Sequence, residues 1–74
     1  MKTLDKQKSG QIYEIEGVFC ANKKYLFRLL ELGFVPGQKV EICKKSILKR
    51  VFLVKIRGGL LSIRANLLRF VSVK

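Results

Sequence analysis

Residues 32–37 read Leu32-Gly33-Phe34-Val35-Pro36-Gly37, and this stretch decides how the chain folds. Gly33 stands where helices commonly end on a left-handed residue, and Pro36 cannot continue a helix. Pro36 and Gly37 also suit the second and third positions of a type II turn, because proline presets φ and glycine accepts a positive φ. The stretch therefore predicts the end of a helix and then a turn into a new strand.

A helix is predicted immediately before this stretch, over residues 23–32. Asn22 is a favourable N-cap, and the apolar side chains that follow recur at three- and four-residue spacing, the period of a helix with one apolar face. These side chains are Tyr25, Leu26, Leu29, Leu30 and Leu32. A helix of this length is not stable alone in water, so its leucine face must pack on another part of the chain.

The remaining sequence has the two-residue period and the β-branched content of strands. The expected strands cover about residues 11–16, 39–43, 51–57, 60–64 and 70–73. Gly58-Gly59 is predicted to form a two-residue hairpin turn, because both positions tolerate a positive φ. Residues 65–69 indicate one helical turn, capped by Asn66.

Five short strands and one helix cannot form two full sheets in 74 residues. A bent meander that closes on itself removes exposed sheet edges and suits this length. We therefore predict a mainly β fold, a small SH3-like barrel of about five strands, with the helix between the first and second strands. No repeat, linker or low-complexity tract interrupts the chain, so we expect a single domain over residues 1–74.

The composition excludes several classes of protein. No apolar run reaches the 18 or more residues of a membrane span, and the start of the chain lacks the apolar segment of a secretory signal. A cytoplasmic protein is therefore expected. The chain has no His, no nucleophile beside a base and no phosphate-binding loop, so we predict neither catalysis nor a cofactor.

Metal binding is not expected either. The only soft ligands are Cys20 and Cys43, which lack metal-ligand spacing, and the five carboxylates are scattered. One disulfide between the two cysteines is conceivable, but both lie among apolar or strand-like neighbours. We expect them to be small buried side chains.

The basic residues are concentrated in the second half of the chain. The net charge is +11, and residues 42–74 hold nine basic and no acidic residues, whereas residues 1–41 hold seven basic and all five acidic ones. Such a field attracts anionic partners. These are nucleic acid, an acidic protein surface or the anionic headgroups of a membrane.

One basic segment is a candidate partner-binding loop. The apolar pair Ile47-Leu48, which we expect to be exposed, is flanked by Lys44, Lys45, Lys49 and Arg50. The cations of such a loop can steer an acidic partner while the apolar pair anchors it, although charged runs are also common on solvated sheet edges. Three apolar side chains could extend the patch from the helix end, or could simply belong to the core. These are Leu29, Leu32 and Phe34.

The central segment also resembles a known family. Residues 28–37 read R-L-L-E-L-G-F-V-P-G, which is similar to the R-L-x-E-L-G-[FLM]-x-P-G signature of FeoA-like domains (ferrous iron transport protein A). The flanks agree in order with Leu4, Gly10 and Ile12, with Val40-Glu41-Ile42, with Gly58 and Ile63-Arg64, and with Phe70-Val71-Ser72-Val73. Of these pieces, the motif that contains Gly33, Pro36 and Gly37 is the specific one. Residues 44–50 depart from the family, because they lack its Gly- and Pro-containing loop.

The resemblance implies an SH3-like barrel and an accessory role in bacterial ferrous iron uptake. The implied partner is the large membrane transporter of that system (ferrous iron transport protein B), which has a cytosolic G-protein domain. The same fold occurs as a C-terminal module of metal-dependent transcriptional repressors. We expect the stand-alone form here, because the barrel takes up residues 1–74 and leaves no room in this sequence for a DNA-binding helix-turn-helix before it.

A nucleic-acid-binding barrel is the alternative hypothesis, and the charge of the second half supports it. Binders of single strands usually combine basic residues with exposed aromatic rings on which bases stack. The only aromatic residues in the basic half are Phe52 and Phe70, which we expect to face the core. The missing stacking platform favours the protein-binding adaptor.

Overall fold

A computed structural model describes all residues from Met1 to Lys74. The elements follow in the order η1 (Leu4–Lys6, a 3-10 helix), β1 (Ile12–Val18), α1 (Lys23–Glu31), β2 (Lys39–Ser46), β3 (Val51–Ile56), β4 (Gly59–Arg64), α2 (Ala65–Leu68) and β5 (Val71–Val73). The predicted mainly β fold, with the principal helix between the first and second strands, is confirmed. No helix is long and apolar enough to cross a membrane.

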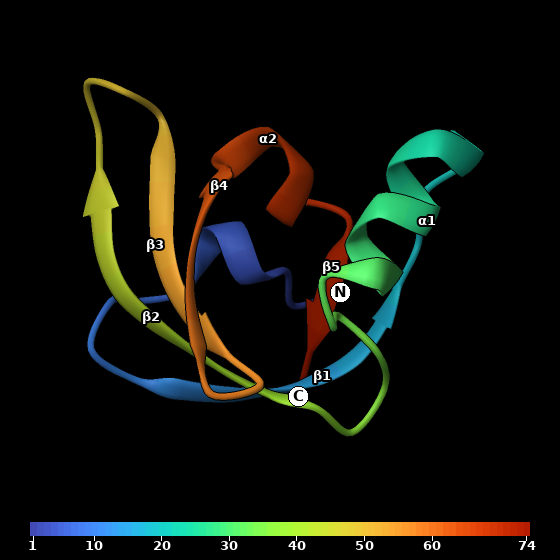
Figure 1. Cartoon of the computed structure of the whole chain (residues 1–74), viewed down its shortest axis with the longest axis horizontal. Helices are drawn as coiled ribbons and strands as arrows, with labels where there is room; N and C mark the ends of the chain where they lie inside the picture. Colours follow the sequence, from blue (N-terminus) through green and yellow to red (C-terminus); the bar gives the residue numbers. More distant parts are fainter.

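The strands form one antiparallel sheet in the order β4-β3-β2-β1-β5. The sheet bends strongly, so that its two edge strands approach each other from opposite sides, with η1 and α2 between them and α1 beside β1 and β5 (Figure 1). Strands β4 and β5 are not paired with each other. The barrel is therefore open between them, and α2 links the two edges where full closure was expected.

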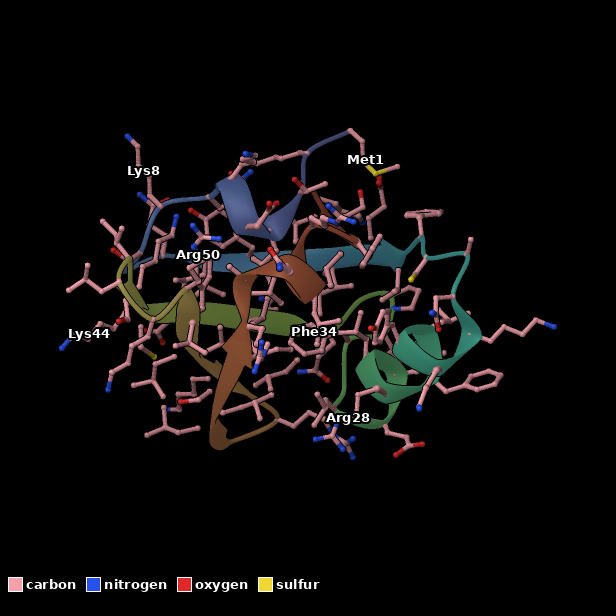
Figure 2. The ribbon with its side chains drawn as sticks, turned by 90° about the horizontal axis from the view of Figure 1, so that it is seen from above. Met1, Lys8, Arg28, Phe34, Lys44 and Arg50 are labelled. Carbon is pink, nitrogen blue, oxygen red and sulfur yellow. The ribbon has the colours of Figure 1, made fainter.

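The interior is one cluster of fourteen buried side chains. Each of the three helical segments contributes one fully buried leucine, which is Leu4 from η1, Leu29 from α1 and Leu68 from α2. Phe34, just after α1, is also fully buried and lies inside the molecule in Figure 2. The alternation predicted along the strands is confirmed in β1, in β3 and at the start of β2, where Val40 and Ile42 both face the core. In β5 it is absent, because Ser72 is buried like its two neighbours.

The predicted helix and turn around Gly33 are confirmed. The Asn22 side chain accepts hydrogen bonds from the backbone N–H groups of Lys24 and Tyr25, which caps α1. At the other end Gly33 has φ +108°, and the N–H of Phe34 donates to the carbonyl of Leu29 over 3.0 Å. Together with the bond from Gly33 N–H to Leu30, this is the pattern of a Schellman motif, which explains why the helix stops there.

The turn after α1 has the predicted form as well. The N–H of Gln38 donates to the carbonyl of Val35 over 3.1 Å, and Gly37 has φ +89° at the third position. These values suit a type II turn, with Pro36 at its second position. The motif shared with the FeoA-like signature is thus a helix stop and a turn, and both are needed to start β2.

Two local predictions were wrong, the hairpin turn by one position and the N-cap of α2 by two. The β3–β4 turn consists of Arg57 and Gly58, with φ +54° and +78°, because Gly59 already pairs with Ile56. Both central residues of a type I′ turn need a positive φ, so the arginine adopts it here. Asn66 does not cap α2; the N-cap residue is Arg64, without a side-chain cap.

Candidate partner-binding surfaces

Ion pairing inside the protein uses almost none of its positive charge. Lys74 is the one basic residue whose side chain lies within 4.0 Å of an Asp or Glu carboxylate, at 2.9 Å from Glu14. The hydrogen bond to Lys74 lowers the pKa of Glu14 from its ordinary value of 4.5, and the same contact raises the pKa of Lys74 from 10.5. The other basic side chains are therefore free to attract anions from outside the chain.

The first candidate surface is the basic tip, which we define as residues 47–50 with the flanking Lys44 and Lys45. Its apolar pair is almost completely exposed, Ile47 at 87% and Leu48 at 97%. The exposure predicted for this pair is thus confirmed. In Figures 1 and 2 the tip lies at the end of the molecule away from α1.

A β-bulge decides how the cations of the basic tip are arranged. Strand β2 continues to Ser46, three residues beyond its predicted end, and its register with β3 shifts between Ile42 and Lys44. After the bulge Lys45 pairs with Phe52, and its ammonium lies 4.9 Å from the centre of that ring. Lys44 is exposed, because consecutive residues of a strand point to opposite faces. The bulge decides which of the two faces each lysine takes.

The basic tip is held at its base and free at its apex. Ser46 pairs with Val51 to close the hairpin, and the carbonyl of Arg50 accepts a hydrogen bond from the N–H of Ala65 over 2.9 Å. Arg50 has φ +53°, a left-handed conformation that turns the chain back into β3. The exposed pair therefore extends from a fixed base.

The surface extension predicted at the helix end is wrong for two of its three residues. Leu29 and Phe34 are fully buried in the core, because the Schellman motif folds Phe34 back under α1. Leu32 is half-buried and packs against the same core. The alternative interpretation, a leucine stripe that serves as core, is correct here.

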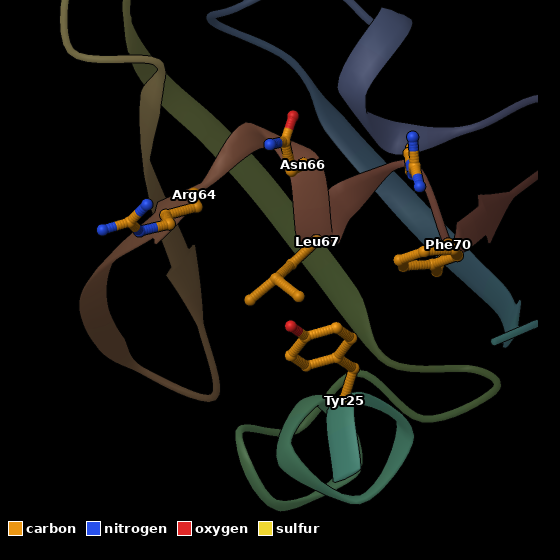
Figure 3. A pocket seen from close by; sticks show the side chains of 6 residues that line it. Tyr25, Arg64, Asn66, Leu67 and Phe70 are labelled. Carbon is orange, nitrogen blue, oxygen red and sulfur yellow. The ribbon is translucent and has the colours of Figure 1, made fainter. Parts of the chain in front are cut away.

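The second candidate surface was not predicted. We call it the aromatic groove and define it by Tyr25 and Phe27 on α1, Leu67 on α2, Phe70 after α2, and Arg64 and Arg69 at its rim. Tyr25 is 46% exposed and Phe27 55%. In Figure 3 the Tyr25 ring rises from α1 toward Leu67, with Phe70 to one side and Arg64 on the other.

The aromatic groove brings together residues that are far apart in the sequence. Its α1 part comes from the first half of the chain, and its arginines come from the basic second half. The Arg69 guanidinium lies 4.9 Å from the centre of the Phe70 ring. Phe70 is half-buried and precedes β5, so the prediction that it faces the core within a strand is only partly right.

One sequence signal could have pointed to this groove. Phe27 lies two residues before Leu29, and residues two apart on a helix point in widely different directions. An aromatic side chain on the outer face of an amphipathic helix has no role in packing the core. The position of Arg64 and Arg69 beside α1 could not have been predicted, because it depends on how the sheet bends.

The chemistry-bearing side chains do not gather into a site. No group of three or more His, Cys, Asp or Glu side chains lies together. Cys20 and Cys43 are free and half-buried, so the predicted full burial of both is wrong, and no disulfide joins them. That the protein holds no metal of its own stays a prediction.

The model of the FeoA domain family matches residues 2–74, whereas no curated protein matches. A FeoA protein of Stenotrophomonas maltophilia, solved as a complex with zinc and described as an SH3 domain protein, is 27% identical over 100% of this chain and 91% of its own, with a TM-score of 0.87. The FeoA protein of Chlorobium tepidum is 28% identical over 96% of this chain and 67% of its own, with a TM-score of 0.80.

A more distant likeness shows how widely the fold is used. A manganese-dependent transcriptional repressor has a TM-score of 0.90 over 99% of this chain and 40% of its own, but only 11% identity, which shows the fold alone. The SH3-like architecture predicted from the strand pattern is confirmed by these structures. The family model covers nearly the whole chain, including the helix stop and turn at residues 33–37, and the chain therefore belongs to the FeoA domain family, which is linked to ferrous iron transport.

Proposed function

We propose that this protein is a cytoplasmic accessory protein of bacterial ferrous iron uptake and that it acts by binding the large membrane transporter of that system. Its docking element is the basic tip, and the transporter's cytosolic G-protein domain is the partner surface. The observation that carries the proposal is the pair Ile47 and Leu48, which stand almost fully exposed at the apex of a hairpin whose base is fixed.

The basic tip has the two properties of a docking element. Its apolar pair gains free energy by leaving water, roughly 1.5–3 kcal/mol for each fully buried side chain, when it enters a pocket of the partner. The surrounding cations have no carboxylate partner within the protein, so they can steer the encounter with an acidic surface. The same charges favour the anionic inner face of the membrane, where the transporter lies.

A binding measurement on the purified proteins tests this proposal. The protein is titrated against the transporter in detergent, without nucleotide, with GDP and with a GTP analogue. We expect the double variant Ile47→Asp/Leu48→Asp to bind at least about tenfold more weakly than the native chain. The matched control is Ile12→Asp/Leu60→Asp, which introduces the same charge at two exposed apolar residues outside the tip.

Two results would contradict the proposal. One is that the native protein binds the transporter in no nucleotide state. The other is that the control variant loses as much affinity as the tip variant, since binding would then depend on the net charge of the protein and not on the apolar pair.

Nucleic-acid binding is the second candidate function. It is favoured by the exposed rings of Tyr25 and Phe27, which supply aromatic surface that the second half alone lacks. Tyr25 lines one hollow together with Arg64 and Arg69 of the basic half. Titration with single-stranded DNA and RNA at about 50 mM and about 200 mM salt tests it, because contacts to phosphate alone weaken steeply over this range. Tight binding at the higher salt would favour this candidate over the adaptor.

A further inference from the structure

We propose that the aromatic groove is a second docking site and that it binds an acidic segment whose apolar side chain enters the groove while its carboxylates pair with the arginines of the rim. This inference rests on the proposed function, since it assumes that the protein acts by binding other proteins. It adds a second surface, which is separate from the basic tip but adjoins its base at Asn66, and a defined chemistry for its ligand.

The shape of the groove suits an apolar anchor. Two adjoining hollows of about 490 Å³ each share Tyr25 and Leu67 in their linings. Phe70 continues the lining on one side and Phe27 on the other. An inserted side chain would thus meet aromatic and aliphatic surface from both α1 and α2.

The charges of the groove select an acidic ligand. Arg64 and Arg69 line the first hollow, and Lys24 and Arg28 line the second. None of these four side chains has a carboxylate within 4.0 Å, whereas Glu31 is the one acidic residue in either lining. Guanidinium groups bind carboxylates in a bidentate geometry, so two free arginines beside an apolar hollow favour carboxylates that flank an apolar residue.

The same observations argue against other occupants. A second copy of this chain carries a net charge of +11 and would be repelled by the arginine rim. A nucleic acid strand would find an aliphatic floor at Leu67 and a carboxylate at Glu31, both poor partners for bases and phosphates. An acidic peptide with an aliphatic or aromatic anchor is therefore the occupant that the geometry favours.

The test uses the isolated full chain and synthetic peptides. The probes are short peptides in which Phe, Leu, Tyr or Trp stands between Asp and Glu residues, a peptide with the same acidic residues around Ala, and a single-stranded oligothymidylate. Binding is followed through backbone amide shifts in NMR spectra at about 50 mM and about 200 mM salt. We expect at least one anchored peptide to shift amides of α1 and α2, and to bind at least about tenfold more tightly than the alanine peptide.

Two variants with a matched control assign the interaction. Arg64→Glu/Arg69→Glu is expected to lower the affinity for the anchored peptide at least about tenfold. Phe27→Ser, at an exposed position, is expected to lower this affinity without unfolding the chain. Lys39→Glu/Lys55→Glu makes the same change in net charge at exposed residues of β2 and β3, outside the groove. It is expected to change the affinity by no more than about twofold in low salt.

Each contrary result overturns the proposal. One such result is that no anchored peptide binds, and another is that the alanine peptide binds as tightly as the anchored ones. A third is that the amide shifts fall at the basic tip and not on α1 and α2. The fourth is that, at the higher salt, the oligothymidylate binds the groove more tightly than the anchored peptides do. The transporter is absent from this experiment. A failure here leaves the tip result standing, and a failure of the tip variant leaves this result standing.

Discussion

The basic tip and the aromatic groove both combine apolar side chains with cations, but the tip projects from the molecule and the groove is a hollow in it. Each places apolar side chains among cations that have no carboxylate partner. At the tip the apolar pair projects from a hairpin apex, whereas in the groove the apolar side chains line a hollow between two helices. A projecting pair can only enter a pocket of its partner, and a hollow can only receive a side chain from its partner.

The two surfaces also depend differently on the core. The tip is attached by the last pair of the β2–β3 hairpin and by one hydrogen bond to Ala65. The groove is formed by α1 and α2, which are held in place by the buried side chains of Leu29 and Leu68. Changes in the core should therefore damage the groove, whereas changes at the apex of the tip should leave the fold intact.

The largest effect is expected from Phe34→Ala. This side chain is fully buried next to the end of α1, and its loss leaves a cavity that costs about 3–5 kcal/mol of unfolding free energy. A domain of this size has about 4–11 kcal/mol in total, so the variant should be near the limit of folding. Urea unfolding followed by circular dichroism measures this. A fall in the free energy of unfolding of less than about 1 kcal/mol would show that the core beneath α1 is not tightly packed around Phe34.

A smaller effect is expected from Gly33→Ala at the end of α1. Its φ of +108° strains any residue with a side chain, and an added Cβ would collide with the Cδ atom of Arg57. We expect the free energy of unfolding to fall by about 2–3 kcal/mol. The control Gly37→Ala, where φ is also positive but the space is open, should lower it by about 1–2 kcal/mol. Equal losses in the two variants would mean that the contact between α1 and the β3–β4 turn is unimportant.

Leu48→Ala should separate binding from folding. The side chain is 97% exposed, so the unfolding free energy should change by no more than about 0.5 kcal/mol. Affinity for the transporter should nevertheless fall, while the affinity of the groove for an anchored acidic peptide stays unchanged. If both affinities fell together, the two surfaces would not be independent.

The smallest effect is expected from Glu14→Gln, which removes the ion pair with Lys74 on the exposed surface. The pKa of Glu14 is lowered, so its contribution is present above about pH 4.5 and is lost as the pH falls through the folded value. The pKa of Lys74 is raised, so its contribution is complete below about pH 10.5 and is lost above the folded value. The difference between the native and variant melting temperatures should be largest between about pH 4.5 and about pH 10.5 and should shrink beyond both limits, and neither surface should lose affinity. A difference that persists in acid strong enough to protonate Glu14 in the folded protein would indicate another cause.

The local features of this fold could be predicted and the long-range ones could not. The cap at Asn22, the stop at Gly33 and the turn at Gly37 follow from the preferences of single residues, and all three were predicted. The bulge near Cys43 could not be read from the chain, because it depends on how two strands share hydrogen bonds.

The same limit explains the errors at the candidate sites. The exposure of Ile47 and Leu48 follows from their position between cations in a turn, which is local information. The burial of Phe34 depends on the Schellman motif and on the sheet beneath it, and the groove depends on the approach of α2 to α1. Sequence patterns indicated which residues were apolar, but only the bend of the sheet decides which of them meet arginines.

The two ends of the chain lie side by side, and this permits a different construction of the molecule. The N–H of Val73 donates to the carbonyl of Lys2 over 2.8 Å, and Thr3 pairs with Ser72. A short glycine-rich linker could therefore join Lys74 to Met1, and new ends could be opened between Ile47 and Leu48. Such a circular permutant would keep every strand pair and the groove, while the tip would become two free ends that cannot enter a pocket as one projection.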